Sequence, residues 1–316
     1  MFIRYFFISA ISSWFILLSL NQLDFVRWHI FDPEFGIWSA KENLIQKVSG
    51  KDVVLILGDS RTSTAFHPLE NSKVLNLSIG GATPVEAYFI LNRLISNNTH
   101  IEKLIISFVP IHFEFSENFL GRAILFNFYL PNEFDDLLNQ SSNQALFGND
   151  LISIYSCRYK TPNCYMPYYK TLLTSGYSTK NIAIYQETVS QNGWHLYGEN
   201  GWNPAAKINK PTEFQNMKRR FIPDSLINNY FDRLLVLAKE NKIPITYYIL
   251  PIEQKSYEAI LKEVYINQYF EYIKSKDIDI IYGGGMKIEY VGDGNHYNKA
   301  GSDIITKDIN KNIINR

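Results

Sequence analysis

The sequence predicts an α/β protein built on a doubly wound parallel sheet. Short, continuous apolar segments recur along the chain, as expected for strands buried on both faces of a parallel sheet. Amphipathic segments with helical spacing alternate with them, which is the order that such a sheet requires. The chain has 316 residues and is 46% hydrophobic, which is enough for one large domain or two smaller ones with a buried core.

The expected elements follow one another in a regular order. The predicted strands cover residues 53–57, 74–77, 104–109, 245–250 and 278–282. The predicted helices cover residues 84–97, 225–241, 256–275 and 299–314. In the last helix the isoleucines share one face with helical spacing, so we expect this helix to pack against the sheet. We therefore assign residues 51–110 and 223–316 to the α/β domain.

An uncharged, apolar segment runs from Tyr5 to Leu20 near the N-terminus. A helix of this length spans about 24–28 Å, which suffices for the hydrocarbon core of a bilayer. We therefore expect residues 1–23 to form a single-pass transmembrane anchor and residues 24–50 to form a juxtamembrane connector. A cleaved signal peptide is the alternative, but no convincing cleavage site with small residues follows the segment. We expect the large domain to lie outside the cytoplasm.

Residues 111–222 interrupt the alternation of strands and helices. This stretch is rich in aromatic residues, and an insertion of this length is expected to form a cap or subdomain. In α/β enzymes, such insertions commonly cover the carboxyl ends of the strands, where ligands bind. The stretch holds both cysteines of the chain, Cys157 and Cys164, whose spacing matches no zinc or redox pattern. They would form a disulfide in an oxidising compartment and remain free thiols in the cytosol.

The charges of the chain are balanced. Lys and Arg total 31 residues, and Asp and Glu also total 31, which gives no electrostatic argument for a nucleic acid partner. No spacing in the sequence is typical of a metal site. The Gly283-Gly284-Gly285 triplet lacks the strand-to-helix context of a phosphate loop. We therefore expect no nucleic acid partner, no metal ion and no cofactor.

A serine stands directly after the first predicted strand, within Gly58-Asp59-Ser60-Arg61. A hydroxyl at the carboxyl end of a central strand lies where the ligands of α/β proteins bind. If a helix begins here, its free N–H groups and the positive end of its dipole face a developing oxyanion. The alternative is that Asp59 or Ser60 only caps the helix, and the tripeptide taken alone favours this alternative.

A second polar motif precedes the last predicted helix. Asp293 and His296 lie in a glycine-rich turn, at a spacing that lets the carboxylate bind one imidazole nitrogen while the other points to a nucleophile. Such a carboxylate fixes the imidazole tautomer and stabilises the imidazolium. The alternative is a surface turn with an incidental histidine. The motif reads Gly292-Asp293-Gly294-Asn295-His296-Tyr297-Asn298-Lys299-Ala300-Gly301.

Together the two motifs resemble those of the SGNH (GDSL-like) superfamily. In that family the nucleophile lies in an early Gly-Asp-Ser block, and the Asp and His lie in a final Asp-x-x-His block. The resemblance implies a flavodoxin-like, doubly wound sheet and a catalytic triad of Ser60, His296 and Asp293. Residues 74–83 look like the second block of the family, which implies an oxyanion hole formed by the N–H groups of Ser60 and Gly81.

Four further residues are weaker candidates. Arg61 directly follows the proposed nucleophile, where it would bind an anionic substrate group or pair with an acidic neighbour. Asn76, within the second block, is a candidate substrate-binding residue. His112 and His195 have no partner visible in the sequence, and a lone histidine is more often structural than catalytic.

One block of the family is missing. The third block, Gly-x-Asn-Asp, supplies an Asn side chain to the oxyanion hole, but the third predicted strand ends here in Ser107-Phe108-Val109-Pro110. Loss of one such donor costs about 2.7–4 kcal/mol in an acyl-transfer site. This departure weakens the expectation of simple hydrolysis and favours transfer of the acyl group to another acceptor.

The sequence therefore predicts a membrane-anchored serine acyl-transfer enzyme. It is similar to the anchored proteins of teichoic-acid D-alanylation and alginate acetylation, which also lack the third block. We expect it to act on O-acyl groups of a cell-envelope polysaccharide or a lipid-linked glycan, with a membrane protein as the candidate acyl donor. The alternatives are a membrane-tethered esterase or lipase, and a non-catalytic carbohydrate-binding or assembly protein of the same fold.

Overall fold

The chain divides into two compact units in the computed structural model. Unit 1 consists of Met1–Ala40 and Glu117–Gln186, and unit 2 of Lys41–Ser116 and Glu187–Arg316. The boundaries fall inside two helices, α3 (Glu34–Lys47) and α10 (Lys180–Ser190). The structure describes residues 2–31, 34–68, 73–114, 119–141, 151–176, 178–197, 220–292 and 296–314.

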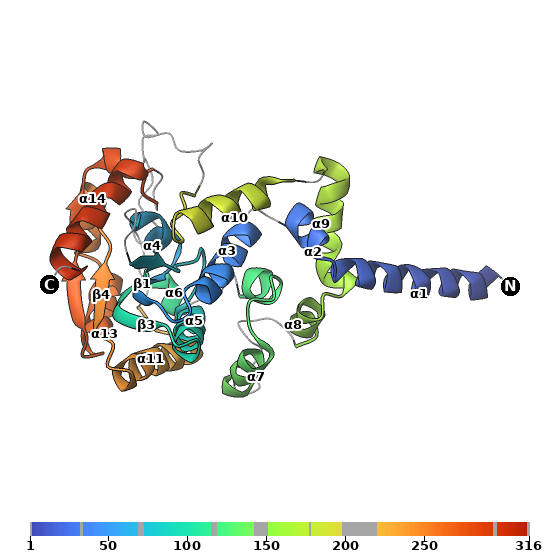
Figure 1. Ribbon diagram of the computed structural model, residues 1–316, viewed down its shortest axis with the longest axis horizontal. Coiled ribbons are helices and arrows are strands. Elements are labelled where there is room, and N and C mark those ends of the chain that lie inside the picture. The colour runs from blue at the N-terminus through green and yellow to red at the C-terminus, as the bar shows by residue number, and fades with distance from the viewer. Residues whose placement is uncertain are drawn as a thin grey trace. The chain divides into compact units, whose positions relative to one another are not determined.

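Unit 2 contains a five-stranded parallel sheet with the strand order β2-β1-β3-β4-β6 (Figure 1). Numbered within this sheet alone, the order is 2-1-3-4-5, which is that of flavodoxin-like sheets. The prediction of an α/β fold with a parallel central sheet is confirmed. The strands are β1 (Asp52–Gly58), β2 (Val74–Asn76), β3 (His100–Ser107), β4 (Ile245–Ile249) and β6 (Asp279–Tyr282), and β5 (Ile252–Glu253) pairs separately with β7 (Gly285–Met286).

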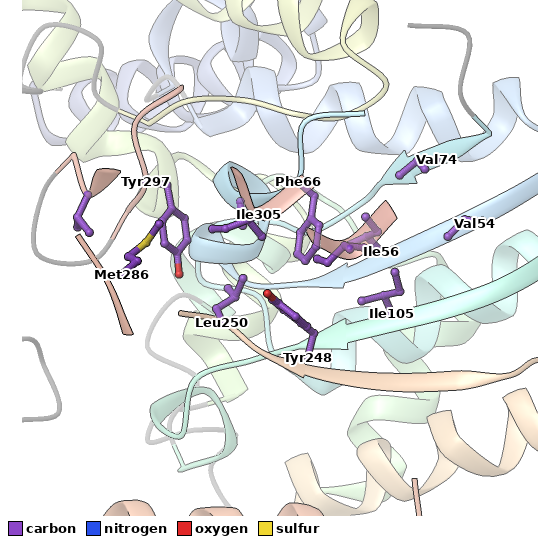
Figure 2. Packing of buried hydrophobic residues seen from close by; sticks show 13 residues of the cluster. Val54, Ile56, Phe66, Val74, Ile105, Tyr248, Leu250, Met286, Tyr297 and Ile305 are labelled. Carbon is purple, nitrogen blue, oxygen red and sulfur yellow. The ribbon is translucent and has the colours of Figure 1, made fainter. Parts of the chain in front are cut away.

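Both faces of β1 are covered, which explains why its sequence is apolar throughout. Val54 and Ile56 belong to a cluster that also contains Phe66 and, from helix α14 (Lys299–Ile309), Ile305 (Figure 2). Alternate residues of a strand point to opposite faces. Leu55 points away from this cluster and is fully buried as well, on the face where helix α5 (Pro84–Ser96) contacts β1 and β3.

The helices of unit 2 begin where the sequence offers capping groups. Thr83 caps α5 with a reciprocal capping box to Glu86, and Asp224 caps α11 (Ser225–Glu240). These two helices pack against each other (Figure 1). The other helical segments of the unit are α4 (Ser60–Ala65), α6 (Ile111–Glu114), α12 (Gln254–Ile260), α13 (Val264–Lys274), η3 (Ile288–Tyr290) and η4 (Asn310–Ile314).

The single helix predicted over residues 256–275 is instead two helices, α12 and α13. Ile260 and Ile266 are both buried and line the same pocket. In one continuous helix these two side chains would point about 240° apart. The break between the helices allows both isoleucines to face the interior, so tertiary packing overrides the local helical pattern.

Unit 1 is helical and has an aromatic core. The rings of Phe31 and Phe35 both pack against Phe126, and Phe31 also packs against Tyr165. Residues 24–40 therefore form part of this core, which corrects the expectation that they form a connector. The remaining elements are α1 (Phe2–Asn21), α2 (Asp24–Ile30), η1 (Phe119–Ile124), α7 (Pro131–Gln140), α8 (Leu151–Arg158) and α9 (Pro162–Ser175).

Helix α1 exposes nearly all of its apolar side chains and extends away from the other helices of unit 1 (Figure 1). Its segment Arg4–Asn21 has a mean hydropathy of 1.2, so α1 is long and apolar enough to be a membrane anchor or a signal sequence. At the end of the helix, the Asn21 amide donates to the carbonyl oxygen of Lys160 at 2.9 Å and accepts from the Tyr169 hydroxyl. These bonds attach α1 to α9.

Cys157 and Cys164 form a disulfide that joins the end of α8 to the start of α9. Of the two states that the sequence left open for these cysteines, the structure has the bonded one.

Candidate functional site

Ser60 is the first residue of α4, and only the N-cap residue Asp59 separates it from the end of β1. The carboxylate of Asp59 caps this helix: one oxygen accepts from the N–H groups of Arg61 at 2.9 Å and Thr62 at 3.3 Å. The other oxygen accepts from the N–H of Val109, which follows β3, at 3.0 Å. Asp59 thus performs the capping role and leaves the Ser60 hydroxyl at the helix N-terminus available for chemistry.

His296 lies beside this hydroxyl. Its Nε2 atom is 2.9 Å from Ser60 Oγ, within hydrogen-bond distance. The turn that carries His296 is fixed by a hydrogen bond from Gly292 N–H to the His296 carbonyl at 2.8 Å. An antiparallel bridge between Val291 and Tyr297 also supports this turn. The fold thereby joins two motifs from opposite ends of unit 2.

The residues after His296 explain the rest of the C-terminal motif. Tyr297 is fully buried, and its hydroxyl donates to the carbonyl oxygen of Pro251. Burial raises the pKa of Tyr297 to about 12, so its hydroxyl stays protonated at neutral pH. Asn298 caps α14 by accepting from the N–H of Gly301 at 3.0 Å. A side chain at Gly301 would meet the Tyr290 carbonyl oxygen at 2.2 Å, so this position requires glycine.

Asp293, the predicted third member of the triad, lies outside the residues that the structure describes. Ser60 and His296 are both half-buried, so they lie against the protein interior while remaining accessible to a ligand. The structure thus brings together the predicted nucleophile and the predicted base.

Gly81 lies in the turn between β2 and α5 and has a φ of 72°, a left-handed conformation that glycine adopts without strain. The N–H of Ile79 donates to the Gly58 carbonyl at 3.0 Å, which places this turn beside the end of β1 and the Ser60 helix. Gly81 is therefore in the part of the fold where its predicted oxyanion role requires it.

The structure gives Asn76 a structural role instead of the predicted substrate-binding one. Its side chain is fully buried, and Nδ2 donates to the carbonyl oxygens of Thr62, Ser63 and Phe66 at 2.9–3.3 Å. Its Oδ1 accepts from the N–H of Ser78 at 3.1 Å. The amide thus attaches α4 to the end of β2, and this internal use corrects the expectation.

Arg61 is 5% exposed and lines a small pocket at the carboxyl ends of β3 and β4. The pocket has a volume of about 40 Å³. Its other walls are mainly apolar and come from both strand ends, from α12 and from α13. They include Phe108, Val109, Leu250, Ile266 and Phe270.

Tyr197 is a site residue that the sequence pattern did not reveal. Its ring stacks on His296, with ring centroids 5.4 Å apart and an interplanar angle of 28°. Its hydroxyl accepts a hydrogen bond from the N–H of Gly80 at 2.9 Å. Tyr197 belongs to no motif and comes from the predicted insertion, so only the fold could show that it contacts both His296 and the Gly80 turn.

Comparison with known protein families finds a match over most of the chain. A family model described as "Protein of unknown function (DUF1574)" matches residues 37–282, more than half of the chain. The chain belongs to this family. The matched region contains Ser60, Gly81 and Tyr197 and ends before the His296 turn. A search of curated proteins finds no match.

The two further histidines occupy different positions around the site. His112 Nε2 lies 3.7 Å from the Asp59 carboxylate that caps α4, so it contacts the cap of the helix that carries Ser60. His195 is buried and packs edge-on against Tyr197. Burial, reinforced by the charge of Lys41, lowers the pKa of His195 to about 4, so its imidazole is neutral at pH 7.

Lys41 supports the same region from α3. It is fully buried, and its side-chain nitrogen donates to the carbonyl oxygens of Asn76, at 2.7 Å, and Gly193. Burial lowers the pKa of Lys41 well below its usual value. Lys41 therefore links the end of β2 to the turn that precedes His195.

One group in the described part of the chain combines ligands suited to a metal ion: Asp52, His100 and Glu102. All three are exposed, and the Lys73 ammonium contacts both carboxylates. The group lies at the amino ends of β1 and β3, whereas Ser60 follows the carboxyl end of β1. It is therefore no part of the candidate site.

Proposed function

We propose that this protein is a membrane-anchored, SGNH-type serine acyltransferase that acts on O-acyl groups of a cell-envelope polysaccharide or lipid-linked glycan. The observation that carries the proposal is the 2.9 Å contact between His296 Nε2 and Ser60 Oγ at the carboxyl end of a parallel sheet. The 2-1-3-4-5 strand order and the Asp59 cap support it, because they present the hydroxyl at a helix N-terminus.

In the proposed first step, Ser60 Oγ attacks the carbonyl carbon of the acyl donor while His296 Nε2 takes the hydroxyl proton. The C=O π pair moves to the carbonyl oxygen, which the N–H groups of Ser60 and Gly81 stabilise. Collapse of this intermediate breaks the bond to the leaving alcohol, which receives the proton from His296. Asp293 would orient His296 and stabilise its imidazolium form. An acceptor hydroxyl then attacks the acyl-Ser60 ester while His296 Nε2 takes its proton. The bond to Ser60 Oγ breaks, Ser60 regains the proton from His296, and the acyl group remains on the acceptor.

Two features of unit 1 support the proposed location. Helix α1 has the length and composition of an anchor, and disulfides such as Cys157–Cys164 persist mainly in oxidising compartments. A domain outside the cytoplasm would meet envelope glycans, and a membrane protein is the candidate source of the acyl group.

The decisive experiment is labelling of the full chain in detergent with a fluorophosphonate probe. Wild-type protein should be labelled, and Ser60→Ala should lose all labelling because the attacking oxygen is removed. Ser63→Ala is the matched control, since it removes a buried hydroxyl from the same helix and should label like wild type. Labelling that persists in Ser60→Ala would exclude Ser60 as the nucleophile.

The alternatives predict different results. A membrane-tethered esterase should hydrolyse p-nitrophenyl acetate rapidly without any acceptor, whereas a transferase should be accelerated by added glycan. A wild-type protein that remains unlabelled and inactive would favour a carbohydrate-binding or assembly role for this fold.

A further inference from the structure

Tyr197 contacts both functional parts of the proposed site. Its ring stacks on the base His296, and its hydroxyl accepts from the N–H of Gly80. Gly80 directly precedes Gly81, whose N–H is a proposed oxyanion donor. The Tyr197 hydroxyl is therefore held one residue away from the proposed oxyanion hole.

The corner after β3, where the third family block would supply an Asn side chain, uses its polar groups internally. The N–H of Phe108 donates to the Tyr247 hydroxyl at 3.1 Å, and the N–H of Val109 donates to Asp59. The Phe108 carbonyl accepts from the hydroxyls of Tyr247 and Tyr269 at 2.9 and 2.7 Å. Residues 107–112 contain no Asn, so a donor equivalent to the third-block Asn would have to come from another segment.

We propose that Tyr197 is this donor: its O–H group stabilises the oxyanion in place of the missing Asn. The inference rests on the proposed acyl transfer at Ser60. The Gly80 N–H donates to the hydroxyl oxygen and so holds it beside the proposed oxyanion hole, and in the proposed transition state the O–H group donates to the substrate oxygen. As the Ser60 Oγ–carbon bond forms, the carbonyl oxygen becomes negative and this hydrogen bond strengthens. No proton leaves Tyr197.

The Tyr197 ring has a second effect, on His296. When His296 takes the serine proton it becomes an imidazolium cation, and an aromatic face within about 6 Å stabilises a cation. The centroid separation of 5.4 Å is within this range. The hydroxyl and the ring of Tyr197 therefore act on the two charges that form together in the first step.

Two substitutions separate these effects in the full chain. Tyr197→Phe keeps the ring and removes only the hydroxyl; it should lower kcat for p-nitrophenyl acetate about 100-fold while KM changes little. Tyr197→Leu removes the ring as well; it should lower kcat further than Tyr197→Phe does, because the imidazolium that forms at His296 loses the aromatic face.

The matched control is Tyr272→Phe. Tyr272 lies on α13, where its hydroxyl donates to Asn228 of α11, so the substitution also removes one tyrosine hydrogen bond. Its kcat should equal that of wild type, and thermal unfolding should show that all variants fold.

The outcomes distinguish this inference from the proposed function. Wild-type kcat in Tyr197→Phe would overturn the donor role while leaving Ser60 as the nucleophile. An increase in kcat would also overturn it, because it would show that the hydroxyl obstructs the oxyanion site. A wild-type protein without reaction or labelling at Ser60 would overturn both the inference and the proposed function.

Discussion

Unit 1 and unit 2 use their aromatic residues differently. In unit 2, tyrosine hydroxyls bind specific partners: Tyr247 and Tyr269 both donate to the Phe108 carbonyl, and Tyr248 donates to Asp308. In the core of unit 1, Phe31 and Phe126 pack through their rings, and a disulfide adds a covalent constraint, while the Tyr169 hydroxyl donates to Asn21 at the end of α1. Directional bonds position individual groups, whereas ring packing mainly fills space, and the candidate site with Ser60 and His296 lies in unit 2.

The strongest test of this contrast removes a polar side chain from the core of unit 2. Asn76→Ala deletes an amide that satisfies three buried carbonyls and one N–H, so we expect a loss of about 4 kcal/mol in unfolding free energy. Urea denaturation measures this loss. Asn241→Ala removes an exposed bond from the amide to the Leu237 carbonyl and should cost less than about 1 kcal/mol. Equal losses in the two variants would contradict the structural role of Asn76.

A second test uses the pH dependence of unit 2. The pKa of His195 is about 4 in the folded protein, below its usual 6.5. Between pH 4 and pH 6.5, His195 is therefore protonated in the unfolded chain and neutral in the folded protein. Protonation of the unfolded chain lowers the free energy of unfolding, so the folded protein is most stable with respect to His195 above pH 6.5 and loses this stability as the pH falls toward 4. We expect His195 to account for a decrease of about 3 kcal/mol in unfolding free energy over this range.

The measurement compares denaturation at several pH values for wild type and His195→Phe, which keeps a ring against Tyr197. The variant should show a flatter pH dependence. His100→Gln, at an exposed position, serves as the control and should retain the wild-type slope. An unchanged slope in His195→Phe would show that His195 is not buried as a neutral group.

The smallest effect is expected in unit 1. Replacing both Cys157 and Cys164 by Ser opens a loop with a sequence separation of 7. The chain-entropy model predicts a loss of about 2.5 kcal/mol for a loop of this size. Thermal unfolding should show this loss, while fluorophosphonate labelling of Ser60 at 25 °C should equal that of wild type. A fall in labelling would show that the site depends on the disulfide and would break the contrast between the units.

The elements and chemical motifs of unit 2 were largely predictable from the sequence. Strand β1 is apolar throughout because both its faces are covered, and Asp59 caps the helix that presents Ser60. The Asn298 cap likewise follows from a local backbone requirement, the N–H of Gly301 three residues later. Such features depend on residues within a few positions of one another, so they can be read without the fold.

Other features depend on contacts between distant segments. The break before α13, the internal role of Asn76 and the packing of residues 24–40 into unit 1 each result from partners that are remote in the sequence. The Tyr197 stack on His296 is of the same kind. No local pattern encodes them, because burial and hydrogen-bond satisfaction are decided only when the segments pack together.

The sequence by itself thus determined the parallel α/β fold, the apolar helix near the N-terminus and the motifs that contain Ser60 and His296. The tertiary structure decided that these two side chains lie within hydrogen-bond distance and that the ring of Tyr197 stacks on His296. The physical reason is the distance along the chain over which each effect acts. Periodicity and capping depend on residues a few positions apart, whereas the geometry of a site depends on the packing of segments that are far apart in the sequence.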